Sequence, residues 1–177
     1  DSYVSSPIHS PISGKVDKII KLVNPVTSGL IDAAVIESDG KDSWIELTEL
    51  FNMQKSEDFN SLKRIIESLD KKEILDMIRE AGIVGLGGAT FPTHVKLNPP
   101  PDKKIDTVIL NGCECEPFIT SDHRLMLENG REILIGLYII NNILSPQNIY
   151  IAIEDNKRDA INKLQELIVM MDFSNLF

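Results

Sequence analysis

The sequence DTVILNGCECEPFITSDHRLMLE, from Asp106 to Glu128, is the stretch that decides the fold of this chain. Residues 106–110 form a short apolar run of strand length, and residues 121–128 have a helical pattern. A second helical segment covers 132–142, a second buried strand covers 148–153, and a third helix covers 157–171. Strand, helices, strand and helix in this order predict a βαβ unit with a parallel sheet.

Two further helices are predicted before this unit, at 59–69 and 71–81. Apolar side chains fall on one face of the first helix: Leu62, Ile65, Ile66 and Leu69. Asp70 followed by Glu73 resembles a capping box that opens the second helix, and Gly82 would end it. The proline-rich residues 98–102 cannot form a helix or a central strand, so they predict an extended connector.

The first part of the chain has a different composition, rich in Val, Ile, Ser, Pro and Gly. Residues 6–16, 18–20 and 33–36 are predicted to form short strands separated by turns. We therefore expect a β-rich segment over residues 1–52 and an α/β domain over residues 53–177. Since the sequence begins with Asp1 and not with Met, we expect it to be a piece of a longer protein.

The composition argues against several classes of function. The net charge is −9 over 177 residues and no basic run occurs, which argues against a nucleic-acid surface or a polybasic membrane contact. The longest apolar run, at 134–140, is far shorter than the ~20 residues of a membrane span. The two cysteines, Cys113 and Cys115, are too close in sequence for an unstrained disulfide, which favours a reducing compartment.

A glycine-rich stretch, GIVGLGGATFPTHVK from Gly82 to Lys96, contains Gly85, Gly87 and Gly88 within four residues. Glycine allows positive φ and close approach of a ligand to the backbone. Consecutive free N–H groups ahead of a helix would form an anion site, and Lys96 adds positive charge, which suggests a phosphate-bearing cofactor. The stretch is not a Walker A loop, which would end in Gly-Lys-Ser/Thr, and it is not a dinucleotide fingerprint, because a helix and not a strand precedes it. A plain glycine-rich turn is equally compatible with this pattern.

A second group of polar residues follows the strand at 106–110. Asn111, Glu114, Glu116 and Asp122 lie within a dozen residues, at the end of a parallel strand where open α/β sheets bind ligands. An asparagine could pair with the edge of a ring, and a carboxylate could hold a ribose hydroxyl or a carboxamide. The alternative is an Asn-Gly turn surrounded by solvated acids.

The two thiols suggest a metal site as a further alternative, with His94 or His123 as an additional ligand. Cys113 and Cys115 fall short of the four ligands that structural zinc or an iron–sulfur cluster needs. We therefore expect no metal in this chain and interpret the thiols as buried or pocket-lining.

Three ordered motifs together resemble the RnfC family, the peripheral subunits of Rnf electron-transport complexes. They are GIVGLGGATFPTHVK at 82–96, NGCECEPFITSDHRLMLE at 111–128 and IYIAIEDNKRDAI at 149–161. The same block is similar, more distantly, to the NADH-binding flavoprotein subunit of respiratory complex I. The opening SPIHSPISGKV resembles the barrel-sandwich (lipoyl-type) segment that precedes the flavin domain of RnfC, without the lysine hairpin of a lipoylated carrier.

The resemblance implies a Rossmann-like parallel-sheet domain that binds FMN and NADH, accepts hydride and passes electrons singly to iron–sulfur centres. Gly85, Gly87 and Gly88 match the family's loop around FMN and the nucleotide. Lys96 matches the lysine near the flavin phosphate. One charged contact with the nucleotide is absent, because Leu86 stands where the complex I relatives have an arginine.

The acidic residues match the other side of the same pocket. Asn111, Glu114 and Glu116 match the loop beside the isoalloxazine ring, where a glutamate contacts the nicotinamide; Cys113 replaces an aspartate there. Asp155 lies in the segment where complex I flavoproteins carry Gly-Glu-Tyr. Since hydride transfer needs no side-chain acid or base, we expect cofactor-binding residues and no catalytic residue.

The resemblance also implies partners and location. The family's later flavin-contacting segment and its 4Fe-4S cluster domain would lie beyond Phe177, so we expect this chain alone to hold FMN incompletely. Other subunits of an Rnf-type membrane complex are the expected partners, on the cytoplasmic side of the membrane and peripheral to it. The alternatives are a cobalamin-reductase-type flavoprotein of RnfC-like build, a docking module whose flavin site is degenerate, and, least favoured, a metal-binding protein.

Overall fold

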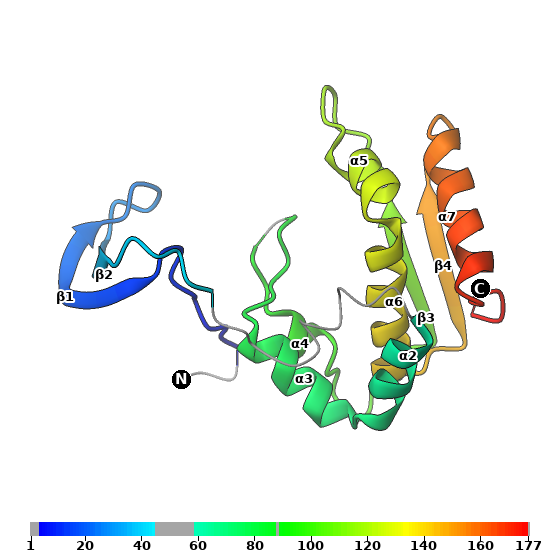
Figure 1. Cartoon of the computed structure of the whole chain (residues 1–177), viewed down its shortest axis with the longest axis horizontal. Coiled ribbons are helices and arrows are strands. Elements are labelled where there is room, and N and C mark those ends of the chain that lie inside the picture. The colour runs from blue at the N-terminus through cyan, green and yellow to red at the C-terminus, as the bar shows by residue number, and fades with distance from the viewer. Residues whose placement is uncertain (1–3, 45–58, 88, 177) are drawn as a thin grey trace.

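The computed structural model describes residues 4–44, 59–87 and 89–176 (Figure 1). The strands are β1 (Gly14–Val23), β2 (Leu30–Ser38), β3 (Thr107–Gly112) and β4 (Asn148–Ile153). The helices are α2 (Phe59–Ser68), α3 (Lys71–Glu80), α4 (Thr93–Lys96), α5 (Ser121–Glu128), α6 (Gly130–Leu144) and α7 (Arg158–Met170). In these ranges the strands form an antiparallel pair, β1-β2, and a parallel pair, β3-β4.

The predicted βαβ unit is confirmed. β3 and β4 pair in parallel from Thr107 opposite Asn148 to Gly112 opposite Ile153, with α5 and α6 between them in sequence. Asn111 and Gly112 belong to β3, so the alternative of an Asn-Gly turn is wrong. Gly112 is buried, and a Cβ there would lie 3.0 Å from the sulfur of Met126 on α5, so the strand and the helix pack closely at this point.

The core of the α/β unit lies between its helices. Phe59 of α2, Tyr138 of α6 and Phe173 after α7 form an aromatic cluster, in which the rings of Tyr138 and Phe173 stack with centroids 5.3 Å apart. Leu134 of α6 and Leu164 of α7 are almost fully buried beside this cluster. A smaller cluster of Ile74, Leu97 and Ile143 joins α3 and the end of α4 to α6.

The capping box of α3 is confirmed. The Asp70 carboxylate accepts from the Glu73 N–H at 2.8 Å, and the Glu73 carboxylate accepts from the Asp70 N–H at 2.8 Å. Gly82 follows the end of α3 with φ of +69°, a conformation that glycine adopts without the strain a side chain would bring. The connector at 98–102 is neither helix nor strand, as predicted, but it is not extended throughout, because the Lys103 N–H donates to the Pro100 carbonyl at 2.9 Å and closes a turn.

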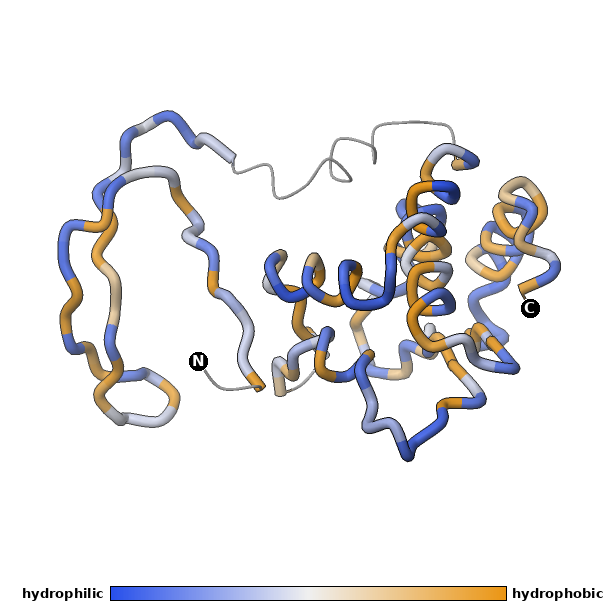
Figure 2. The backbone as a smooth tube through the Cα atoms, turned by 90° about the horizontal axis from the view of Figure 1, so that it is seen from below, coloured by the Kyte–Doolittle hydropathy of each residue, from blue (hydrophilic) through white to orange (hydrophobic). Residues whose placement is uncertain are grey.

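The N-terminal strands differ from the prediction. β1 and β2 form one long hairpin with a bulge between Val16 and Lys18, in place of several short strands, and residues 6–13 lie outside both strands. Pro7 and Pro11 explain the difference, because proline has no N–H to donate to a sheet. The hairpin stands to one side of the helical unit (Figures 1 and 2). Its apolar residues Val23 and Leu30 are exposed.

No helix in the described ranges is long and apolar enough to cross a membrane. The predicted boundary near residue 52 lies outside the described residues, and the division into two domains remains a prediction.

Candidate functional site

The glycine-rich stretch forms a loop that closes at its base and leads into α4. Val84 and Pro92 form an isolated antiparallel bridge. The Gly85 N–H donates to the Phe91 carbonyl at 2.9 Å, and the Thr93 N–H donates to the Ile83 carbonyl at 3.0 Å. Main-chain hydrogen bonds therefore hold the two sides of the loop together. We call residues 82–92 the glycine loop.

Lys96 is placed against this loop. A Cβ built on Gly85 would lie 3.8 Å from the Lys96 Nζ, so the ammonium group is next to the glycine backbone. Lys96 is exposed and forms no ion pair with any residue that the structure describes. Gly87 is exposed with no atom within 4 Å of a Cβ built there, so a ligand could approach its backbone. Gly88 lies outside the described residues.

The expected row of free amides ahead of a helix is not present in full. The N–H groups of Gly85 and Thr93 are already used within the loop, and α4 is a single turn of four residues. A helix dipole therefore contributes little here, since it grows with the number of aligned peptide units. An anion at this site would depend on the Lys96 charge and on the outer part of the loop around Gly87.

The Glu114 carboxylate holds the loop that follows β3. It is only 9% exposed and accepts hydrogen bonds from the Ser121 hydroxyl at 3.0 Å, the Asp122 N–H at 2.8 Å and the His123 N–H at 3.1 Å. Partial desolvation raises the pKa of Glu114, but these three hydrogen bonds and the charge of Lys157 outweigh it and lower the pKa below its ordinary value. We call residues 113–120, which Glu114 ties to the start of α5, the acidic loop.

The other predicted residues near this loop, Asn111 at the end of β3 and Glu116 in the acidic loop, are open to solvent. Asn111 is exposed, and its side-chain oxygen accepts from the Cys113 N–H at 3.1 Å. Glu116 is exposed, and its carbonyl accepts from the Ile119 N–H at 3.3 Å, which makes a tight turn. Cys113 and Cys115 are free and exposed, so they are not buried thiols, and their lining of a pocket stays a prediction. Within the described ranges, no group of three or more potential metal ligands occurs.

Asp155 follows β4 and is exposed. Because β3 and β4 are parallel and Gly112 pairs with Ile153, the acidic loop and the segment 154–156 leave the sheet at the same edge. The backbone at this segment turns, with the Lys157 N–H donating to the Glu154 carbonyl at 3.0 Å.

The predicted residues thus fall into two groups. Gly85, Gly87 and Lys96 form one group at the glycine loop. The residues of the second group lie at the carboxyl edge of the parallel strands: Asn111, Glu114, Glu116 and Asp155. Figure 1 draws the two loops as separate projections, one between α3 and α4 and one before α5.

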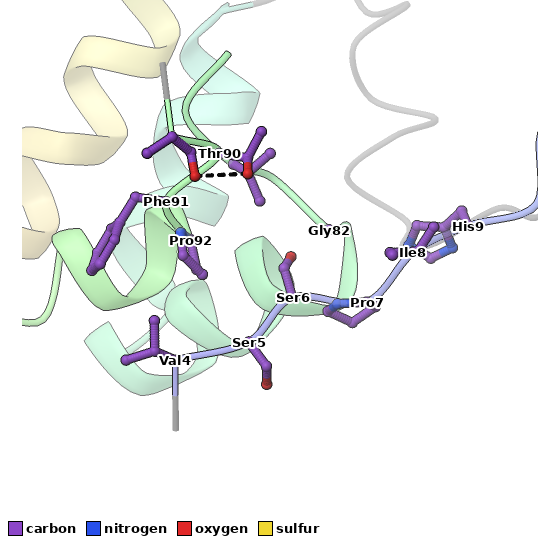
Figure 3. Close-up of a pocket in the computed structure, with 12 residues that line it drawn as sticks. Val4, Ser5, Ser6, Pro7, Ile8, His9, Gly82, Thr90, Phe91 and Pro92 are labelled. Atoms are coloured by element: carbon purple, nitrogen blue, oxygen red, sulfur yellow. Dashed lines mark hydrogen bonds between the residues drawn. The ribbon is translucent and has the colours of Figure 1, made fainter. Parts of the chain in front are cut away.

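Sequence reasoning missed two contacts around these groups. His123 of α5 bonds through Nε2 to Asp159 of α7 at 2.8 Å, and this hydrogen bond, together with one from the Ala160 N–H, lowers the pKa of Asp159. Residues 4–9 lie against the glycine loop and line a cleft of about 660 Å³ with it (Figure 3). No local signal in the sequence indicates either contact, because each one joins segments that are far apart along the chain.

Comparison with known proteins identifies the unit that holds these loops. The family model of the Nuo51 FMN-binding domain matches residues 78–172, which is more than half of the chain and includes both loops.

The chain is also similar to individual subunits of two ion-translocating complexes. It is 47% identical to a subunit of the proton-translocating ferredoxin:NAD(+) oxidoreductase complex of Clostridium ljungdahlii, over 94% of this chain and 34% of that protein. It is 41% identical to the corresponding subunit of the Na(+)-translocating ferredoxin:NAD(+) oxidoreductase complex of Acetobacterium woodii, over 95% of this chain and 35% of that protein. The chain thus spans about a third of the length of these two relatives. It belongs to the family of the Nuo51 FMN-binding domain, and within it to the RnfC proteins.

Proposed function

We propose that this chain is the part of an RnfC-type subunit that binds FMN and NADH, takes hydride from NADH and delivers electrons to iron–sulfur centres outside the chain. The observation that carries the proposal is the position of the Lys96 ammonium beside the backbone of Gly85, within the segment that matches an FMN-binding domain.

The chemistry of the glycine loop fits a flavin phosphate. Lys96 is a cation with no ion-pair partner in the described chain, and a phosphate group would supply the missing negative charge. Gly87 offers backbone that no side chain covers, which suits a ligand that must come close. FMN would supply the ability to accept a hydride and release electrons singly, while the chain binds and orients it.

The acidic edge fits the nicotinamide end of NADH. Asn111, Glu116 and Asp155 are exposed at the carboxyl edge of the parallel strands, with oxygen atoms that can accept from a carboxamide or a ribose hydroxyl. Glu114 differs from them, because its two oxygens already accept three hydrogen bonds. In this proposal Glu116 is the free glutamate of the acidic loop, and Glu114 keeps the loop in place.

The names of the relatives support a role in a larger assembly. Both relatives are subunits of ion-translocating ferredoxin:NAD(+) oxidoreductase complexes, so we propose that this chain works beside the other proteins of such a complex. A peripheral position on the cytoplasmic side of the membrane, where NADH is available, fits this role.

Titration of the purified protein with FMN tests the proposal. Flavin fluorescence should be quenched on binding, and NADH added afterwards should bleach the visible absorbance of the flavin under anaerobic conditions as hydride is transferred. Absence of any quench in the full-length RnfC-type protein, shown to be folded by circular dichroism, would contradict the assignment of the flavin site.

The alternative of a docking module with a degenerate flavin site has one observation in its favour. Leu86, which stands where complex I relatives have an arginine, is 90% exposed at the tip of the glycine loop. An exposed leucine suits contact with another protein better than contact with a phosphate. The same titration separates the two functions, because a docking module would bind its partner protein without binding FMN.

A further inference from the structure

Residues 4–9, which we call the N-terminal strap, are far from the glycine loop in sequence but contact it in the structure. The His9 Nε2 lies 2.8 Å from the carbonyl oxygen of Glu80, the last residue of α3. A carbonyl oxygen only accepts hydrogen bonds, so Nε2 must carry the proton that is donated. The strap therefore bonds to a carbonyl in the last turn of α3, where helix carbonyls have no partner within the helix.

The strap also packs directly on Gly82, the first residue of the glycine loop. A Cβ at Gly82 would lie 2.7 Å from the Pro7 carbonyl oxygen and 3.2 Å from the Cδ2 of His9. Both distances are too short for ordinary contact, so any side chain at this position would push the strap away. The positive φ of Gly82 and the closeness of the strap both require glycine here.

Strap and loop together enclose the cleft of Figure 3. Its lining comes from residues 4–9 on one side and from Gly82, Val84 and residues 89–92 on the other. No lysine, arginine or carboxylate is among these lining residues, so the cleft lacks the charge that a phosphate would need. We therefore interpret this cleft as the contact between strap and loop and not as the phosphate site, which lies on the Lys96 side of Gly85.

We propose that the N-terminal strap positions the glycine loop for the flavin phosphate, with His9 as the positioning residue. This inference rests on the proposed function for its role in FMN binding. The glycine loop is closed by few main-chain hydrogen bonds, and its tip is exposed. A contact that fixes the start of the loop lowers the conformational entropy that the loop loses when a ligand binds. The strap therefore strengthens ligand binding, although it does not touch the ligand.

The first test is His9→Ala in the purified protein. The affinity for FMN should fall by about 3- to 10-fold, the range expected from the loss of one hydrogen bond. The melting temperature should change little, because His9 is exposed and lies outside the core. His9→Gln should restore most of the affinity, since its side-chain amide can donate to the same carbonyl. If His9 mattered only for folding, His9→Gln would not restore FMN affinity at an unchanged melting temperature.

Ser10→Ala is the matched control. It changes the neighbouring residue and removes the two hydrogen bonds of the Ser10 hydroxyl, which donates to the Ile12 carbonyl at 2.6 Å and accepts from the Ile12 N–H at 3.3 Å. Both bonds stay within the same segment and do not reach the loop. FMN affinity should therefore be unchanged. Equal FMN affinity in wild type, His9→Ala and Ser10→Ala would overturn the inference.

Amide hydrogen exchange without flavin tests the strap independently of the proposed function. In His9→Ala the amides of Gly82 and Gly87 should exchange faster than in wild type, while those of α6 should not change. Unchanged exchange in the glycine loop would refute the positioning role of the strap, even if the protein binds FMN. If exchange is faster in His9→Ala but wild type does not bind FMN, the flavin function is refuted and the positioning role of the strap is supported.

Discussion

The two loops of the proposed site are held in different ways. The acidic loop is fixed by a buried side chain, because the Glu114 carboxylate accepts three hydrogen bonds from the first residues of α5. The glycine loop is held by main-chain bonds at its base and by the N-terminal strap, and its tip at Leu86 and Gly87 is exposed. The difference indicates that one side of the site is built in advance, while a ligand completes the other.

Reversal of the charge at the glycine loop should have the largest effect. Lys96→Glu replaces the ammonium beside Gly85 with a carboxylate that repels phosphate, so FMN affinity should fall by about 10- to 100-fold. Fluorescence titration measures the change. Lys72→Glu is the control, because Lys72 lies exposed on α3, where it pairs with Asp76 one turn away. If both variants bind FMN equally well, Lys96 is not part of the phosphate site.

Removal of the Glu114 carboxylate should loosen the acidic loop. Glu114→Ala leaves the Ser121 hydroxyl and two amides of α5 without their acceptor, so the melting temperature should drop by several degrees. Glu116→Ala should leave the melting temperature unchanged, since the Glu116 side chain is exposed. If Glu116 binds NADH as proposed, Glu116→Ala should raise the KM for NADH. Equal stability losses in the two variants would remove the distinction between these glutamates.

A side chain at Gly87 should lower the affinity for FMN without changing the stability of the fold. Gly87→Val places bulk where nothing lies within 4 Å, so the fold should tolerate it, but the approach of FMN should be hindered and its affinity reduced by about 2- to 5-fold. Calorimetric titration of FMN and a melting curve provide the two readouts. A lower melting temperature with normal FMN affinity would show that the loop tip is structural and not a binding surface.

Acid should weaken the acidic loop through Glu114. Its pKa in the folded protein lies below the ordinary value of 4.5, so the stabilisation is complete above that pH and is lost as the pH falls through the lowered value. Wild type should therefore lose stability below about pH 4.5 more steeply than Glu114→Gln, which has no proton to bind at this position. If wild type and Glu114→Gln lose the same stability as the pH falls, then Glu114 is not ionised when it accepts its three hydrogen bonds.

Elements that depend on local patterns could be predicted from the sequence. The bounds of α5 and β4 agree with the prediction, and so does the Asp70–Glu73 capping box, because periodicity and capping involve neighbouring residues. The single hairpin of β1 and β2 could not be predicted in detail, since register depends on cross-strand pairing and not on composition.

Contacts between distant residues were the other part that the sequence could not supply. His9 and Glu80 are 71 positions apart, and no pattern in either segment indicates that they meet. The hydrogen bonds from α5 to the Glu114 carboxylate also depend on the path of the backbone through the acidic loop, which brings the start of α5 back to Glu114. The second of these contacts decides which of the predicted acidic residues are free, so the structure refines the assignment of Glu114.

The most direct test of the flavin site compares FMN with riboflavin, which lacks only the phosphate. Wild type should bind FMN about 10- to 100-fold more tightly than riboflavin, because Lys96 and the glycine loop bind the phosphate. In Lys96→Glu this preference should disappear while riboflavin affinity stays the same. A wild type without preference for FMN, or a substitution that weakens both ligands equally, would contradict the assignment of the phosphate site to Lys96 and the glycine loop.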